Sequence, residues 1–277
     1  MHILADWNWQ PSIWIGIALL IGAYLCAIGP LRSRFSVSEP VPRTRAAWFL
    51  LGAWIILLAL VSPLDSLSDE YLFSAHMVQH LLLTLVAPPL LLMGTPGWML
   101  RPVLRYRIVA QVARVLTTPL VSFTVFNAVF LTWHLPALYE ATLHNESIHI
   151  LEHLLFMATG VLNWWPILSQ LPELPRLSPP GQILYLFLEA VPGTVLGALI
   201  VFAPTVLYPT YAAAPRLVGL DALADQQIAG LVMWTLSGMI YLGALTAVFF
   251  AWFGREERTE RDKLDQLTGK QIVKQLP

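Results

Sequence analysis

The sequence has few charged residues and a single cysteine, and each of these shortages excludes some classes of protein. Only 12% of its 277 residues are charged, about half the share usual in a soluble domain, whereas 57% are hydrophobic. The single cysteine, Cys26, excludes a disulfide within the chain and any metal or redox site built on a cysteine pair. A net charge of −1 provides no basic surface for nucleic acid. The composition therefore indicates an integral membrane protein whose surroundings are the lipid bilayer.

Lysine is also scarce, and its placement excludes one class of membrane protein. All three lysines, Lys263, Lys270 and Lys274, lie in the charged C-terminal segment. A retinal-binding photoreceptor needs a lysine inside a membrane span to form its Schiff base, so the chain is not of that class. The first residues, MHILADWNWQ, lack the basic start of a cleaved signal peptide, and we expect the first hydrophobic segment to be retained.

Long uncharged runs are abundant. Seven of them are long enough to cross a bilayer as helices, at about 12–29, 46–61, 73–93, 118–135, 147–168, 182–203 and 226–253. We therefore predict an all-α integral membrane protein, with a seven-transmembrane-helix bundle over residues 1–254 and a charged cytoplasmic tail over residues 255–277.

Basic residues are concentrated on one side of this path through the membrane. Fifteen of the sixteen lie in the connectors 30–45, 94–117 and 169–181 or after Gly254, and one, Arg216, lies on the other side. Because cytoplasmic loops collect Lys and Arg, we expect the N-terminus outside and the C-terminus inside a bacterial plasma membrane.

On this topology all seven histidines fall near the outer face. Two pairs open spans that run inward, His76 with His80 and His149 with His153. Residues four apart share one face of a helix, about 6 Å apart along its axis. Polar groups inside spans are costly and tend to mark function. If the two helices face each other, four imidazoles at equal depth form a metal site.

Copper is the first expectation for the ion, because imidazole suits copper, zinc, iron and nickel and a thioether favours Cu(I). Zinc and haem are the alternatives. The ordinary explanation for any one of these histidines is a hydrogen bond at the membrane interface. We expect further metal ligands, or residues that hold the ligands in position, among His134, Glu152, Asp225, Met77 and Met157. Asp225 also fits the N-cap of the last span, which is the commoner role for an aspartate at a helix start.

Two other functions stay open on the residues alone. A membrane redox protein with two histidines ligating a haem fits the one-sided histidines, and Glu189 inside its span fits a metal transporter. The motif HILEH formally matches that of the inverted zinc peptidases, but those enzymes need a third protein ligand and a water-filled cleft. We expect no enzymatic activity, and we expect Glu152 to orient a histidine.

Four motifs resemble, in matching order, the CtaG family of cytochrome c oxidase assembly factors of the polytopic Bacillus type: AHMVQHLLLTLVAPPLLLMGTP, WHLPALYEATLHNESIHILEHLLFMATGVLNWWPIL, PGTVLGALIVFAPTVLYPTY and DQQIAGLVMW. The resemblance spans about residues 70–250. It implies an accessory protein that matures a haem-copper oxidase, with a part in copper supply as a metallochaperone. Its partner would be an oxidase subunit or another assembly factor. The histidine motifs of the family fall on His76, His80, His149 and His153, with His134 and Asp225 in the flanking motifs.

Overall fold

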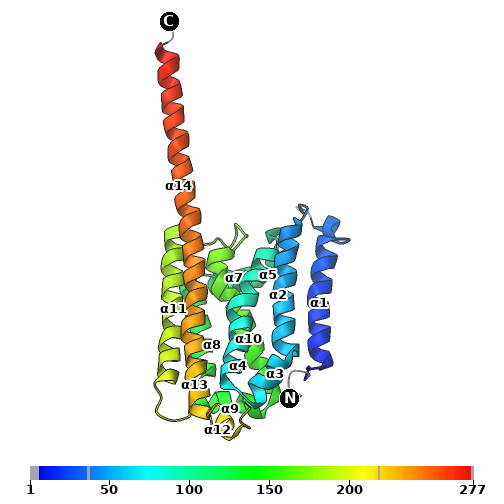
Figure 1. The fold of residues 1–277 in the computed structure, drawn as a ribbon. Helices are drawn as coiled ribbons and strands as arrows, with labels where there is room; N and C mark the ends of the chain where they lie inside the picture. The colour runs from blue at the N-terminus through cyan, green and yellow to red at the C-terminus, as the bar shows by residue number, and fades with distance from the viewer. Residues whose placement is uncertain (1–5, 36–37, 218, 276–277) are drawn as a thin grey trace.

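The computed structural model describes residues 6–35, 38–217 and 219–275, with side chains described as far as residue 263. Every regular element in this part of the chain is a helix (Figure 1). The longer elements are α1 (Pro11–Ile28), α2 (Arg43–Val61), α3 (Pro63–Glu70), α4 (Phe73–Leu81), α5 (Ala87–Gly94), α7 (Arg107–Leu116), α8 (Pro119–Trp133), α9 (Pro136–His144), α10 (Glu146–Leu168), α11 (Pro179–Val201), α13 (Ala222–Leu231) and α14 (Ser237–Gln275). The shorter ones are η2 (Arg32–Arg34), η3 (Leu82–Val86), α6 (Gly97–Leu100), η4 (Val103–Arg105), α12 (Pro209–Ala213) and η5 (Val232–Leu236).

The chain is a multi-pass membrane protein. Five helical stretches are long and apolar enough to cross a bilayer, namely Pro11–Ile28, Arg43–Val61, Phe73–Gly94, Pro179–Val201 and Ala222–Lys263. The pair formed by α7 and α8, bent by 77°, brings the number to six if it is one span. Length and apolarity thus support five or six spans, where the sequence predicts seven. The predicted span at 147–168 corresponds to α10, which is not among these helices. Its buried polar residues, Glu152, His153 and Asn163 among them, lower its mean hydropathy.

The span that carries the first histidine pair is irregular in its middle. It consists of α4, the π-helical segment η3 and α5, and Pro88 and Pro89 follow directly after the irregular turn. Prolines have no N–H to donate, so the carbonyls one turn earlier lose their usual donors. The N–H of Ala87 bonds instead to the carbonyl of Leu82, five residues back. Because residue 88 is a proline, the Thr84 carbonyl has no N–H four residues later to accept from.

Helix α10 packs closely against this irregular turn. A Cβ atom placed on Gly160 would lie 2.6 Å from the Thr84 carbonyl oxygen and 3.0 Å from Cγ of Pro88. Only a glycine allows the two backbones to approach so closely, as small residues do between membrane helices. The contact holds the helix of the second histidine pair against the span of the first.

The two ends of the bundle differ in character. Figure 1 shows α14 extending well past the other helices at one end, and α3, α9 and α12 lying together at the opposite end. The histidine pairs lie in the first turns of α4 and α10, at the end that holds α3 and α9. The proposed boundary between a membrane domain and a tail, at Gly254, falls inside α14 and stays a prediction.

Candidate metal centre

The two histidine pairs converge in the structure. Within each pair the ring centroids are 4.2 Å apart, for His76 with His80 and for His149 with His153. Between the pairs, the rings of His76 and His149 are 5.6 Å apart and those of His80 and His153 are 5.5 Å apart. The assumption that the third and fifth predicted spans face each other is therefore met by α4 and α10.

Ligand atoms gather into two groups that share one residue. His76, His149 and His153 offer donor atoms within 4.8 Å of one another, and so do His76, His80 and Glu152. Glu152 is fully buried, and one of its oxygens lies 3.9 Å from Nε2 of His80. An isolated carboxylate is costly to bury, so Glu152 requires a proton or a cation near it. Of the two roles that the sequence leaves open for Glu152, ligand or support of a histidine, its position in a group of possible ligand atoms is compatible with the first.

Buried polar atoms without partners are concentrated at this centre. In the described part of the chain, ten buried side-chain nitrogen or oxygen atoms lack a hydrogen-bond partner, and seven belong to residues of this cluster. They are Oδ1 of Asp69, Nδ1 of His80, Nε2 of His134, His149 and His153, and both carboxylate oxygens of Glu152. Buried polar atoms are almost always paired in folded proteins, so such a concentration needs an explanation. Imidazole and carboxylate donors without thiolate fit a transition-metal ion such as zinc or copper.

One histidine is held in a definite tautomer by residues far away in the sequence. The hydroxyl of Tyr211 lies 2.6 Å from the Ser68 carbonyl, which accepts its only proton. Nδ1 of His76 lies 2.9 Å from the same hydroxyl and therefore donates to it. The lone pair of His76 is left on Nε2, which accepts a hydrogen bond of 2.7 Å from Nε2 of His80, and the lone pair of His80 is then on Nδ1, a buried atom without a partner. A hydrogen bond from the ring nitrogen that does not bind metal is the usual support of a metal-ligating histidine.

Asp69, at the end of α3, is a neighbour of the centre that we did not predict. Its oxygens lie 3.5 Å from Nδ1 of His149 and 3.9 Å from Nδ1 of His76. Burial, together with the nearby carboxyl groups of Asp65 and Glu70, raises the pKa of Asp69 to about 8. The signal in the sequence is the acidic run PLDSLSDE, which directly precedes the helix of the first histidine pair.

Asp225 caps a neighbouring helix and not its own. Its carboxylate accepts hydrogen bonds from the backbone N–H of Phe73 at 2.7 Å and of Ser74 at 3.2 Å, and so caps α4. The N-cap of its own helix, α13, is Asp221, whose side chain accepts from two N–H groups of the first turn. The N-cap prediction for Asp225 was wrong because that residue lies one turn inside α13, on the side that packs against α4.

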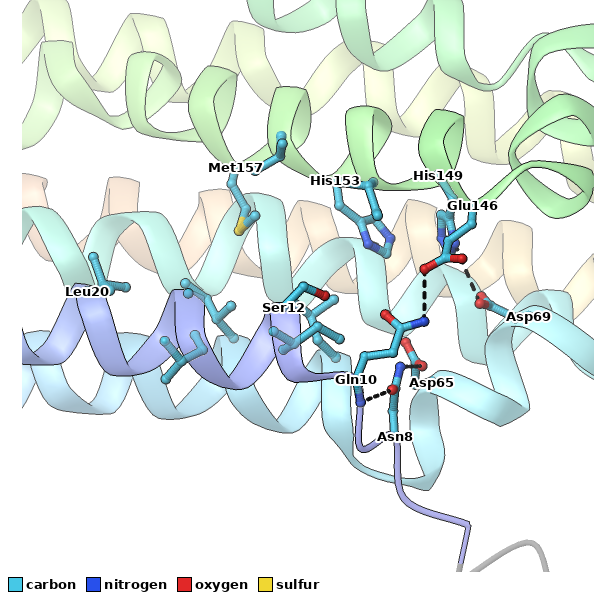
Figure 2. A pocket seen from close by; sticks show the side chains of 17 residues that line it. Asn8, Gln10, Ser12, Leu20, Asp65, Asp69, Glu146, His149, His153 and Met157 are labelled. Atoms are coloured by element: carbon cyan, nitrogen blue, oxygen red, sulfur yellow. Dashed lines mark hydrogen bonds and ion pairs between the residues drawn. The ribbon is translucent and has the colours of Figure 1, made fainter.

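The other candidates lie around the centre. The ring of His134 is 6.1 Å from that of His80, and its Nδ1 donates to the Phe130 carbonyl at 2.7 Å. Met77 is buried in an aromatic cluster with Phe73, Tyr139, Tyr208 and Tyr211. Met157 lines a groove beside His153, as Figure 2 shows.

Glu189 lies apart from the histidines. One of its oxygens accepts a hydrogen bond of 2.9 Å from the side chain of Asn127, and the other is buried without a partner. It belongs to neither group of ligand atoms. The structure therefore separates this carboxylate from the histidine centre.

Comparisons with known proteins place the chain in a family. The family described as "Cytochrome c oxidase caa3 assembly factor (Caa3_CtaG)" matches residues 22–255, and the chain belongs to it. Uncharacterized proteins of Mycobacterium bovis and Mycobacterium tuberculosis are each 24% identical over 274 residues, covering 93% of this chain. The chain spans only 41% of the length of these relatives. No solved structure matches.

Proposed function

We propose that this assembly factor holds copper at the histidine centre and passes it to a haem-copper cytochrome c oxidase, without catalysing a reaction. The proposal rests on one observation above others. Of the seven unpartnered buried atoms at this centre, five belong to residues of the two groups of ligand atoms, and those groups share His76. The family contributes the context of oxidase assembly. The partner would be an oxidase subunit or another assembly factor.

The proposed ligands are His76, His80, His149 and His153, with Glu152 as an additional donor. Imidazole nitrogens without a thiolate bind copper less tightly than a cysteine cage does, and such a site suits transfer better than storage. Zinc would accept the same donors.

We also propose that α8 and α10 complete seven spans, with the histidines at the extracytoplasmic face of a bacterial plasma membrane. The 23 residues of α10 make a helix of roughly 35 Å, longer than the hydrocarbon core of about 30 Å. Its polar residues Glu152, His153 and Asn163 are buried in the protein, away from lipid. The arginines of the connection between α1 and α2 lie at the end from which α14 projects, which supports a cytoplasmic C-terminus.

The experiment is metal analysis with an optical spectrum of the purified protein, comparing wild type with His76→Ala/His153→Ala. We expect copper in the wild type, little in the double variant, and no Soret band in either. His144→Ala is the matched control, since His144 is exposed and bonds only to a backbone carbonyl of its own helix. Copper content unchanged by the double substitution would show that the site is wrong. A Soret band that disappears in His80→Ala would favour the haem protein instead.

A further inference from the structure

A groove opens beside the histidines, between α10 on one side and α1 and α2 on the other (Figure 2). Its volume is about 430 Å³. Polar side chains line its mouth, at the end of the bundle where α1 and α10 begin: Asn8, Gln10, Asp65, Asp69 and Glu146. Further in, the wall carries His149 and His153, and then Met157 with aliphatic side chains of α1 and α2.

The lining of this groove suits a cation. Three carboxyl groups, of Asp65, Asp69 and Glu146, line it, with Glu146 exposed to solvent, and no lysine or arginine is among its lining residues. Beyond them, Nε2 of His149 and Nε2 of His153 are buried without hydrogen-bond partners, and His153 is only 7% exposed. A cleft lined by one sign of charge raises the local concentration of the opposite ion. A mouth that carries carboxyl groups and no basic side chain, and that leads to free imidazole nitrogens, thus suits a metal cation.

Resting on the proposed copper function, we infer that this groove is the port through which the metal ion enters and leaves the centre. Asp69 and His149 receive the ion at the mouth, where their side chains are 3.5 Å apart. His153 and then His76 lie deeper, and His76 belongs to both groups of ligand atoms. An ion held by His76, His149 and His153 can therefore move to His80 and Glu152 while it stays bound to His76.

The outer wall of the port is α1, which leaves most of its surface outside the bundle. The long helix against which α1 mainly packs is α2. Across the mouth, Nε2 of Gln10 donates a hydrogen bond of 3.0 Å to the Glu146 carboxylate, and this contact is exposed to solvent. A substitution on α1 can therefore change the shape of the groove without disturbing the histidines, which lie on α4 and α10.

The test fills the groove from that wall. Gly16 lines the groove, and a Cβ atom there meets nothing within 4 Å, so Gly16→Trp places an indole in the passage. Gly22→Trp is the matched control, because it lies on the same helix, has equal space and does not line the groove. Cu(I) is supplied as a coloured weak chelate, and its transfer to each purified full-length variant is followed by stopped flow. Gly16→Trp should slow uptake and release roughly tenfold, with Gly22→Trp like wild type.

A second variant tests the mouth by charge alone. Glu146→Gln should lower the rate of Cu(I) uptake and weaken its dependence on salt, whereas Glu173→Gln, at an exposed ion pair with Arg101, should change neither. Equal uptake rates in Gly16→Trp and Gly22→Trp, with normal binding at equilibrium, would overturn the port and leave the copper function standing. Absence of copper binding by the wild type at equilibrium would overturn the copper function itself.

Discussion

The hydroxyl group of Tyr211 lies 2.9 Å from Nδ1 of His76, although the two residues are 135 positions apart in the chain. Because this hydroxyl gives its proton to the Ser68 carbonyl, His76 is left with its lone pair on Nε2, facing the other ligand atoms. A loop helix, α12, thus determines the protonation pattern of a residue on α4.

Tyr211→Phe should weaken metal binding about 10- to 100-fold, because loss of a hydrogen bond behind a ligating histidine typically has that effect. Competition titration against a chelator measures the affinity. The matched control is Tyr208→Phe, which removes a buried tyrosine hydroxyl that bonds to the His134 carbonyl at 2.9 Å and not to a histidine ring. If both variants lose the same affinity, the loss comes from packing and not from the tautomer of His76.

Single histidine substitutions should not be equivalent. His76→Ala removes a member of both ligand groups and should cause the largest loss of affinity. His80→Ala leaves His76, His149 and His153 together, and should retain weaker binding with fewer nitrogen ligands. Metal titration measures the affinity, and X-ray absorption of the bound ion measures the number of nitrogen ligands. Equal losses for His76→Ala and His80→Ala would argue against a shared residue.

Glu152→Gln should separate stability from binding. The metal-free variant should be no less stable than wild type, because an unpaired buried carboxylate is replaced by a neutral group of similar shape. Its gain in melting temperature on adding metal should be smaller, since one oxygen donor is weakened. Thermal unfolding with and without Cu(I) gives both values. A wild-type response to metal in Glu152→Gln would exclude Glu152 as a ligand.

Asp225→Ala should destabilise the protein by about 0.5–2 kcal/mol, the usual cost of losing a helix cap. It should also weaken metal binding, because the N–H groups released belong to the first turn of the helix that carries His76. Asp221→Ala is the comparison, as it removes the cap of α13 and leaves α4 untouched. Chemical unfolding and metal titration are measured on both. Unchanged affinity in Asp225→Ala would mean that its cap does not position the centre.

Gly160→Ala should destabilise the bundle by roughly 1–3 kcal/mol, the usual cost of overpacking. The added methyl group would meet the Thr84 carbonyl at 2.6 Å, and a backbone atom cannot move aside as a side chain can. The shift of α10 should also separate the histidine pairs and lower metal affinity. Gly243→Ala is the control, because a Cβ atom there meets nothing within 4 Å. Wild-type unfolding and affinity in Gly160→Ala would show that the helices are free to move apart.

Local patterns in the sequence were sufficient for several conclusions about this chain. Runs of apolar residues determine which segments can cross a membrane, and a spacing of four determines that His76 and His80 share a helix face. The family resemblance was confirmed over residues 22–255. The predicted count of seven spans was supported only as five or six, and α10, with its buried polar residues, is not among the helices apolar enough to cross a membrane.

Contacts between distant segments were decided only by the tertiary structure. The periodicity of a sequence shows which face of a helix is polar, but it does not show which other helix that face packs against. The meeting of the two histidine pairs depends on the close approach of α10 to the widened turn after His80, at Gly160. The same holds for Asp225, whose carboxylate accepts from a backbone N–H 152 positions away. These contacts arise from packing and from the pairing of buried polar groups, and such requirements act across the whole fold and leave no local pattern.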